Sequence, residues 1–267
     1  MRAFKLFLIV LLIPLLALTI FLIVKIYRKH KSSNATERAN GGSQEKSNDG
    51  KRNLNKSVSI ISNLNKDIKE YKKMIEAKSN VTVVDVPLEN CSEIMMKNKQ
   101  KFYRNNNTVL VNAADSRFET WGGGINKVIS NFVLNKNGVT NNKWTGLMSP
   151  VKYPNDTRIK ISNFKNGYVL HLVGLQAKEL QRLNLKIEDI EEYIISLYLN
   201  GLDEIESMIG QGNVLLCFVS TGVFANDGVD SKGKRFSKNE FVLRAKLACF
   251  KAIQKYNGKL NIVLNLR

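Results

Sequence analysis

Apolar and polar positions along residues 81–267 predict strands and helices in alternation. Short apolar or β-branched runs, typical of buried strands, occupy residues 81–86, 108–111, 158–163, 168–173, 214–219 and 260–264. Between them, apolar residues recur at three- and four-residue spacing, as on one face of a helix, over residues 128–133, 187–209 and 237–256. We expect the helix over 187–209 to break near Asn200-Gly201. The alternation predicts an α/β domain with helices on both faces of a mostly parallel or mixed sheet.

Residues 1–31 predict a membrane anchor with a basic flank. Residues 6–24 carry no charge and are long enough to cross a hydrocarbon core as a single helix. A cleaved signal peptide is the alternative, but this apolar run is longer than a usual signal core and no small-x-small cleavage site follows it. Four basic residues between 25 and 31 follow instead, which favours a retained single-pass helix. The positive-inside rule then places the carboxy-terminal part in the cytosol, and the basic flank suits anionic lipid head groups.

Two further segments precede the predicted domain. Residues 32–56 are rich in Ser, Asn, Lys, Glu and Gly, which predicts a flexible tether. Residues 57–80 predict an amphipathic helix. It is either a short coiled coil that pairs two chains or a helix packed on the domain's own surface. The segment spans only about three heptads, which is short for a coiled coil, so we favour the second interpretation. Its apolar positions are Ile61, Leu64, Ile68, Tyr71 and Ile75.

The net charge of +18 is large, but it excludes few functions for the predicted domain. Residues 1–80 hold 16 Lys and Arg against 6 Asp and Glu, so more than half of the excess charge lies outside the predicted domain. A mildly basic domain suits a phosphate-bearing ligand and does not by itself indicate nucleic acid as the partner. The three cysteines lack CxxC spacing, so we expect neither a metal site nor a disulfide framework, and no cofactor. Cys217 and Cys249 lie in apolar patterns and predict buried thiols in a reducing compartment.

A glycine-rich turn between a strand and a helix is the first candidate for ligand binding. The apolar strand over 108–111 leads into Asn112-Ala113-Ala114-Asp115, and three glycines at 122–124 open the next helical pattern. Glycine lets backbone N–H groups come close to a ligand, and a helix start presents unpaired donors with a partial positive charge. This sequence therefore predicts a phosphate site.

Two more loops follow strands at the same edge of the predicted sheet. Asp85 and Val86 end the first strand, and Ser220-Thr221-Gly222-Val223-Phe224 follows the most apolar one. The small residues of the second loop suit an anion held by backbone N–H groups. Because ligands of open α/β sheets bind beyond the carboxyl ends of the strands, the three segments together predict a nucleotide-diphosphate pocket.

These segments resemble the macrodomain family over residues 81–267. The resemblance rests on five blocks in the family's order: Val84-Asp85-Val86, Leu110-Val111-Asn112-Ala113-Ala114, Gly122-Gly123-Gly124-Ile125, Leu170-His171-Leu172-Val173-Gly174, and Val219-Ser220-Thr221-Gly222-Val223-Phe224. It implies a three-layer α/β/α sandwich with a mixed central sheet that binds ADP-ribose or a mono-ADP-ribosylated protein. A Rossmann or Walker A loop, the rival for the glycine turn, fails on spacing and lacks the Lys-Ser/Thr pair.

The resemblance also implies roles for single residues. Asp85 would accept a hydrogen bond from the adenine amino group beside the Val86 N–H, and Asn112 would bond the distal ribose. The glycine turn would line the distal ribose and phosphate through Gly122, Gly123, Gly124, Ile125 and Asn126. The second loop would hold the diphosphate through Ser220, Thr221, Gly222 and Val223, with Phe224 against the distal ribose.

Whether the domain is an enzyme is left open by the sequence. In one hydrolytic branch of the family an Asp follows the glycine turn, whereas this chain has Asn126, which can orient a water but is no general base. Asp115 and Trp121 also depart from the family pattern. Three hypotheses remain: a mono-ADP-ribosyl-protein hydrolase in which Asn112 and the α-phosphate hold the water and Asn126 is a second catalytic candidate, a reader without catalysis, and a degenerate domain that binds RNA or a protein at the membrane. We expect His171 to be a packed, hydrogen-bonded residue rather than a base.

Overall fold

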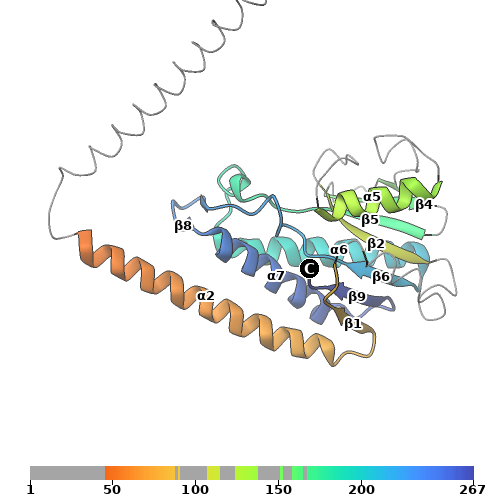
Figure 1. Cartoon of the computed structure of the whole chain (residues 1–267), viewed down its shortest axis with the longest axis horizontal. Helices are drawn as coiled ribbons and strands as arrows, with labels where there is room; N and C mark the ends of the chain where they lie inside the picture. The colour runs from red at the N-terminus through yellow and green to blue at the C-terminus, as the bar shows by residue number, and fades with distance from the viewer. Residues whose placement is uncertain are drawn as a thin grey trace, which may run out of the picture. The chain divides into compact units, whose positions relative to one another are not determined.

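The computed structural model of the chain is drawn in Figure 1. The structure describes residues 46–87, 90, 107–114, 124–137, 151–152, 158–164 and 167–267. Residues Val58–Arg267 form one compact unit, and Met1–Ser57 form a second, of which only residues 46–57, all helical, are described. The account below concerns the first of these units.

A mixed sheet of seven strands forms the centre of the unit, in the order β1-β9-β6-β2-β5-β4-β3. The five strands from β1 to β5 in this order are parallel to their neighbours, whereas β4 pairs antiparallel with β5 and β3 antiparallel with β4. The α/β class and the mixed sheet expected from the sequence are thus confirmed. The strands are β1 Val81–Val84, β2 Thr108–Ala114, β3 Val151–Lys152, β4 Ile159–Phe164, β5 Gly167–Val173, β6 Asn213–Leu216 and β9 Asn261–Asn265.

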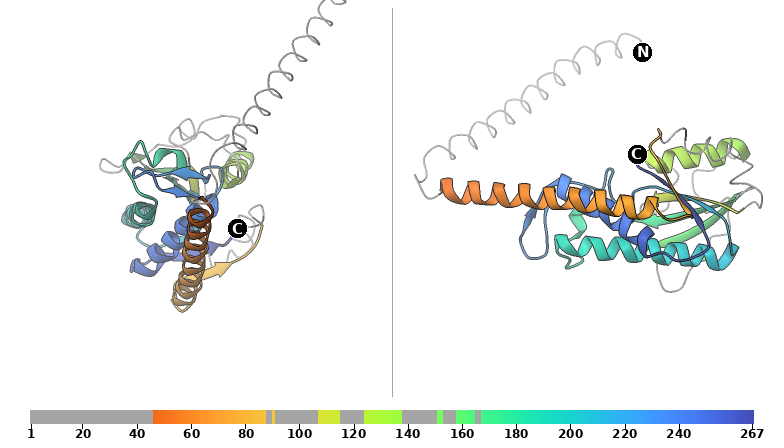
Figure 2. Two further views of the ribbon diagram at one scale, coloured as in Figure 1. Left: turned by 90° about the vertical axis from the view of Figure 1, so that its left-hand side faces the viewer. Right: turned by 90° about the horizontal axis from the view of Figure 1, so that it is seen from below.

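Helices cover both faces of this sheet (Figures 1 and 2). Helix α5, Gly124–Asn137, packs through Ile129 and Val133 on the face that carries Leu110 of β2. Helices α6, Ile190–Ile209, and α7, Lys238–Lys255, pack on the opposite face. Alternate strand residues point to opposite faces, so each apolar strand supplies both cores. The result is three layers with the sheet in the middle.

Helix α2, Lys46–Glu76, buries an apolar side against the domain from Val58 onward. Ile75 is fully buried, and Ile68 and Tyr71 pack on the core that α6 and α7 share. The amphipathic segment therefore packs on its own domain, the second of the two interpretations. The helix starts inside the range 32–56 predicted as a tether, because residues 46–56 contain no proline and a helix, once nucleated, propagates readily.

Lys78 attaches the chain after α2 to the end of α7. Its ammonium group donates to the backbone oxygens of Ile253 at 3.1 Å, Gln254 at 3.0 Å and Tyr256 at 2.6 Å. These carbonyls belong to the last turn of α7, where the helix leaves them without partners and where a positive charge is favourable. One side chain thus caps α7 and fixes the entry into β1.

The predicted break in the second helix is wrong. Helix α6 runs unbroken through Asn200-Gly201. Gly201 is there for packing, because a Cβ atom on it would lie 2.8 Å from a methyl carbon of Leu172 on the sheet. The close contact between helix and sheet outweighs the low helix propensity of glycine.

Several short elements connect the main ones. The 3₁₀ turns η2, Ala177–Glu179, and η3, Ile187–Asp189, lie between β5 and α6, and a ribbon of β7, Gly228–Val229, and β8, Arg235–Phe236, lies between β6 and α7. The sequence did not predict this ribbon. It also predicted a longer strand over 214–219, but β6 ends at Leu216, where the backbone turns into the loop described below.

The described helices include none that is both long and apolar enough to cross a membrane. The predicted span over residues 6–24 lies outside the described residues, as does Cys91. Cys217 and Cys249 are buried free thiols, as expected, and burial raises the pKa of the Cys249 thiol well above its usual range.

Candidate functional site at the carboxyl ends of the strands

The five parallel strands end at one edge of the sheet, and most of the predicted site residues lie there. Asp85 follows β1, Asn112 lies near the end of β2, and the Ser220 loop follows β6. Helix α5 begins at the same edge, since Asn126 in its first turn contacts Asn112. Of the predicted glycine turn, Gly124 and Ile125 form the start of α5, whereas Gly122, Gly123, Asp115 and Trp121 lie outside the described residues.

Asn112 and Asn126 contact each other directly. Asn112 is fully buried on the face of the sheet that α5 covers, and Asn126 lies in the first turn of α5. The Asn112 Nδ2 donates to Asn126 Oδ1 at 2.6 Å. The Asn112 Oδ1 is buried and has no hydrogen-bond partner among the described residues. A buried carbonyl oxygen without a partner is costly, so this oxygen is suited to accept a bond from a ligand.

His171 on β5 links Asn112 to the neighbouring strand β4. Its Nδ1 lies 3.1 Å from Asn112 Nδ2, and its Nε2 lies 3.0 Å from the Ser162 hydroxyl on β4. Burial, and next the positive charge of Lys160, lower the pKa of His171 to about 3. The imidazole is therefore neutral at physiological pH. It is the packed, hydrogen-bonded residue that the sequence led us to expect.

The loop after β6 holds Ser220 in an unusual conformation. Ser220 has a φ of 67°, in the left-handed region that non-glycine residues seldom occupy, and its side chain is buried. Its hydroxyl has no hydrogen-bond partner in the described part of the chain. Strained residues with unpaired polar groups are concentrated at binding sites, where a ligand supplies the missing partner.

Tyr198 of α6 fixes the base of this loop. The fully buried Tyr198 hydroxyl donates to the Cys217 carbonyl oxygen at 2.6 Å and accepts from the Val219 N–H at 2.8 Å. Both backbone groups lie just after the last residue of β6, where the ladder to the neighbouring strands has ended. The tyrosine thus replaces the sheet as their hydrogen-bond partner.

Gly174 makes room for the same loop at the end of β5. A Cβ atom on Gly174 would lie 2.4 Å from both the Ser220 Oγ and the Val219 Cγ1. No real Cβ atom is found so close to another heavy atom, so only glycine fits without moving the loop. Further along, Gly222 and Val223 are exposed, and the carbonyl oxygen of Phe224 accepts from the Ala177 N–H at 2.9 Å.

The residues after β1 are held by two residues that sequence reasoning missed. The buried Asn265 at the end of β9 donates to the Val86 carbonyl oxygen at 3.1 Å and accepts from the Val86 N–H at 3.4 Å. Arg267 donates through Nε to the Asp85 carboxylate at 2.7 Å, and both side chains are more than half exposed. The only signal for Asn265 was a polar residue directly after an apolar strand.

The basic residues after the Ser220 loop belong to a different cluster. Lys234 is paired with Glu188, and the nearly buried Arg244 with Glu240 at 3.1 Å and with Glu191 at 2.9 Å. Asp230 accepts backbone N–H bonds from Ile187, Lys232 and Lys234. These contacts tie the β7–β8 ribbon to the starts of α6 and α7, so Lys234 and Arg244 are part of a structural cluster.

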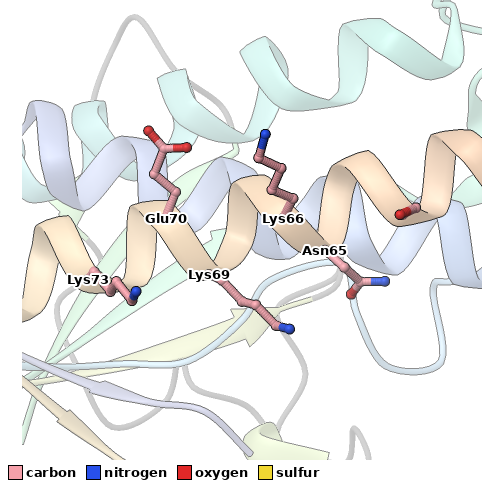
Figure 3. Close-up of a pocket in the computed structure, with 6 residues that line it drawn as sticks. Asn65, Lys66, Lys69, Glu70 and Lys73 are labelled. Atoms are coloured by element: carbon pink, nitrogen blue, oxygen red, sulfur yellow. The ribbon is translucent and has the colours of Figure 1, made fainter.

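Helix α2 carries a shallow hollow on its exposed side, shown in Figure 3. Lys66 and Glu70 point to one side of the helix, and Asn65, Lys69 and Lys73 point to the other. All are exposed side chains of a single helix, so they form no built site. Within the described residues, no group of three or more His, Cys, Asp and Glu side chains is placed to hold a metal ion.

Comparison with known proteins adds little to this geometry. No family model matches the chain, and no curated protein matches it. Among solved structures, a chain described as "Alphavirus P23pro-zbd" is similar at 17% sequence identity and a TM-score of 0.35. The match covers 72% of this chain and 22% of that chain, so the present chain spans less than a quarter of its length. A likeness at this level assigns neither the fold nor an activity.

Proposed function

We propose that this chain is a macrodomain-like protein that binds ADP-ribose, free or attached to a protein, at the carboxyl ends of its parallel strands. The observation that carries the proposal is a pair of buried oxygens without partners at this edge, Asn112 Oδ1 and Ser220 Oγ. A ribose offers hydroxyl donors to the amide oxygen, and a diphosphate offers acceptors to a serine hydroxyl and to loop N–H groups.

The adenine end of the ligand would lie at Asp85 and Val86. The carboxylate of Asp85 would accept from the adenine amino group, and it is oriented near the β1 end by Arg267. Exposed ion pairs contribute only about 0–1 kcal/mol, so a ligand would displace or rearrange this pair at little cost. Asn265 supports the subsite through hydrogen bonds to both the N–H and the carbonyl oxygen of Val86.

Two activities follow from the same pocket. Hydrolysis of the protein–ADP-ribose ester bond would use a water held between Asn112 and the α-phosphate of the substrate. A reader would bind the ligand and perform no chemistry. The contact between Asn112 and Asn126 favours the reader, because the Asn126 amide oxygen is already engaged and an amide has no basic group to activate a water.

The proposal places the domain at a membrane. Residues 6–24 would form a single-pass anchor, with the domain in the cytosol and the basic residues from 25 to 31 near anionic lipid head groups. Alkaline extraction of membranes from cells that express the full chain tests the anchor. The chain should stay in the pellet, and a chain that lacks residues 1–31 should be released. Release of both would remove the anchor from the proposal.

Calorimetric titration of ADP-ribose into the full-length protein tests the binding. We expect a dissociation constant in the micromolar range, corresponding to about 8 kcal/mol, and weaker binding by Asp85→Ala. A folded wild-type protein that shows no heat of binding would refute the proposal. Single-turnover assays on automodified protein, with Asn112→Ala as the comparison, then separate hydrolase from reader. Release of ADP-ribose that Asn112→Ala abolishes would establish the hydrolase, and no release despite binding would establish the reader.

A further inference from the structure

The orientation of the Asn112 side chain is set by its neighbours. Both N–H bonds of Nδ2 are used, one toward Asn126 Oδ1 at 2.6 Å and one toward His171 Nδ1 at 3.1 Å. The planar amide therefore directs its oxygen away from both neighbours. That oxygen is the buried acceptor without a partner. In this orientation Asn112 can recognise only a donor, such as a ligand hydroxyl or a water.

The contact with Asn112 also determines where the proton of His171 lies. An amide nitrogen can only donate, so the His171 Nδ1 must accept and the proton of the neutral ring must be on Nε2. That proton is then directed at the Ser162 hydroxyl oxygen, 3.0 Å away. Ser162 is itself nearly fully buried on β4, so water does not compete for this bond. Residues from three strands and one helix are thus joined by consecutive hydrogen bonds, each with a defined donor and acceptor.

We propose that His171 and Ser162 are positioning residues that hold the Asn112 amide with its oxygen toward the ligand, and that the site thereby selects ligands with a ribose hydroxyl at this point. This inference rests on the function proposed above. If the ring carried its proton on Nδ1, the Asn112 nitrogen would face another donor. The amide would then turn over and offer N–H groups where a hydroxyl donor needs an acceptor. Ser162 holds the ring in place through its contact with Nε2, so that Nδ1 stays directed at the Asn112 nitrogen.

The protonation state of His171 can be measured without any ligand. The chain has two histidines, His30 and His171, so a His30→Gln variant leaves a single imidazole to observe. Nitrogen-15 spectra of the full-length variant should show a protonated Nε2 and an unprotonated Nδ1 near neutral pH. A proton on Nδ1 in the His30→Gln protein would overturn the proposal.

Binding of two ligands separates positioning from a general loss of structure. ADP-ribose carries the distal ribose and ADP does not, so the ratio of their affinities reports on the recognition at Asn112. In His171→Leu this ratio should fall about tenfold, equivalent to about 1.4 kcal/mol, while ADP affinity changes little. His171→Asn should restore most of the ratio, because its side-chain oxygen can accept near the position of Nδ1. Ser162→Ala should lower the ratio by a smaller factor.

Thr108→Val is the matched control. Thr108 is also on β2 and fully buried with an unpaired hydroxyl, but it lies at the opposite end of the strand. It should leave the ratio unchanged. Equal losses for ADP and ADP-ribose in the His171 and Ser162 variants, or an unchanged ratio in them, would overturn the positioning role while the proposed function stands. A wild-type protein that binds no ADP-ribose would refute the proposed function, and the inference would fall with it.

Discussion

Removal of one hydroxyl, in Tyr198→Phe, should loosen the Ser220 loop and destabilise the whole domain. The Tyr198 hydroxyl joins the Cys217 carbonyl oxygen and the Val219 N–H through bonds of 2.6 Å and 2.8 Å, both fully buried. Phenylalanine fills the same space but removes both of these buried hydrogen bonds. An unsatisfied buried donor or acceptor costs about 1–3 kcal/mol, so we expect a loss of about 2–4 kcal/mol in the free energy of unfolding.

Thermal unfolding followed by circular dichroism measures this loss. For a domain of this size about 1 kcal/mol corresponds to a shift of about 2–4 °C, so the midpoint should fall by roughly 4–16 °C. Tyr193→Phe is the matched control, because Tyr193 lies on the same helix, is half-buried and makes no hydrogen bond through its hydroxyl within the described residues. If the two variants unfold at the same temperature, the reasoning about the loop is wrong.

Three other perturbations have definite outcomes. Gly174→Ala should lower the free energy of unfolding by about 1–3 kcal/mol through overpacking and weaken ADP-ribose binding, whereas Gly222→Ala in the Ser220 loop, where a Cβ meets nothing within 4 Å, should leave the free energy of unfolding unchanged in the same melting series. Lys78→Met should cost about 1–2 kcal/mol in denaturant unfolding because the last carbonyls of α7 lose their cap, and the exposed Lys73→Met at the end of α2 should cost less than half of that. Because the pKa of buried His171 lies near 3 and that of an unfolded histidine near 6.5, the unfolded state binds the extra proton in between, so stability is lost as pH falls. Between pH 7 and pH 5 the wild type should lose about 2 kcal/mol more than His171→Asn, and parallel pH profiles would contradict this.

Most of the sheet could be predicted from the sequence because its strands are short apolar or β-branched runs. The runs at 81–86, 168–173 and 260–264 correspond to β1, β5 and β9 within a few residues, and the central parallel strands are buried on both faces. The prediction failed where tertiary contacts outweigh local preference. Gly201 lies inside a helix because the sheet comes close to it, and β6 stops at Leu216 because Tyr198 takes over the next backbone groups.

The sequence predicted which residues lie at the candidate site, but it did not predict most of their hydrogen-bond partners. The resemblance placed Asn112 and Ser220 at strand ends, which the sheet order brings to one edge. Their partners come from distant parts of the chain: Ser162 reaches the site through His171, and Asn265 holds Val86 across 179 positions. No local pattern encodes such pairs. The left-handed φ of Ser220 could not be predicted either, because no residue type other than glycine indicates such a conformation in the sequence.

Hydrogen–deuterium exchange with and without saturating ADP-ribose tests the central claim most directly, because it locates the ligand on the full-length chain. The account predicts slower exchange in three separate peptides, which contain Asp85–Val86, the start of α5 and the Ser220 loop, and unchanged exchange on the exposed side of α2. Protection confined to α2, or no protection at the ends of the strands, would contradict it.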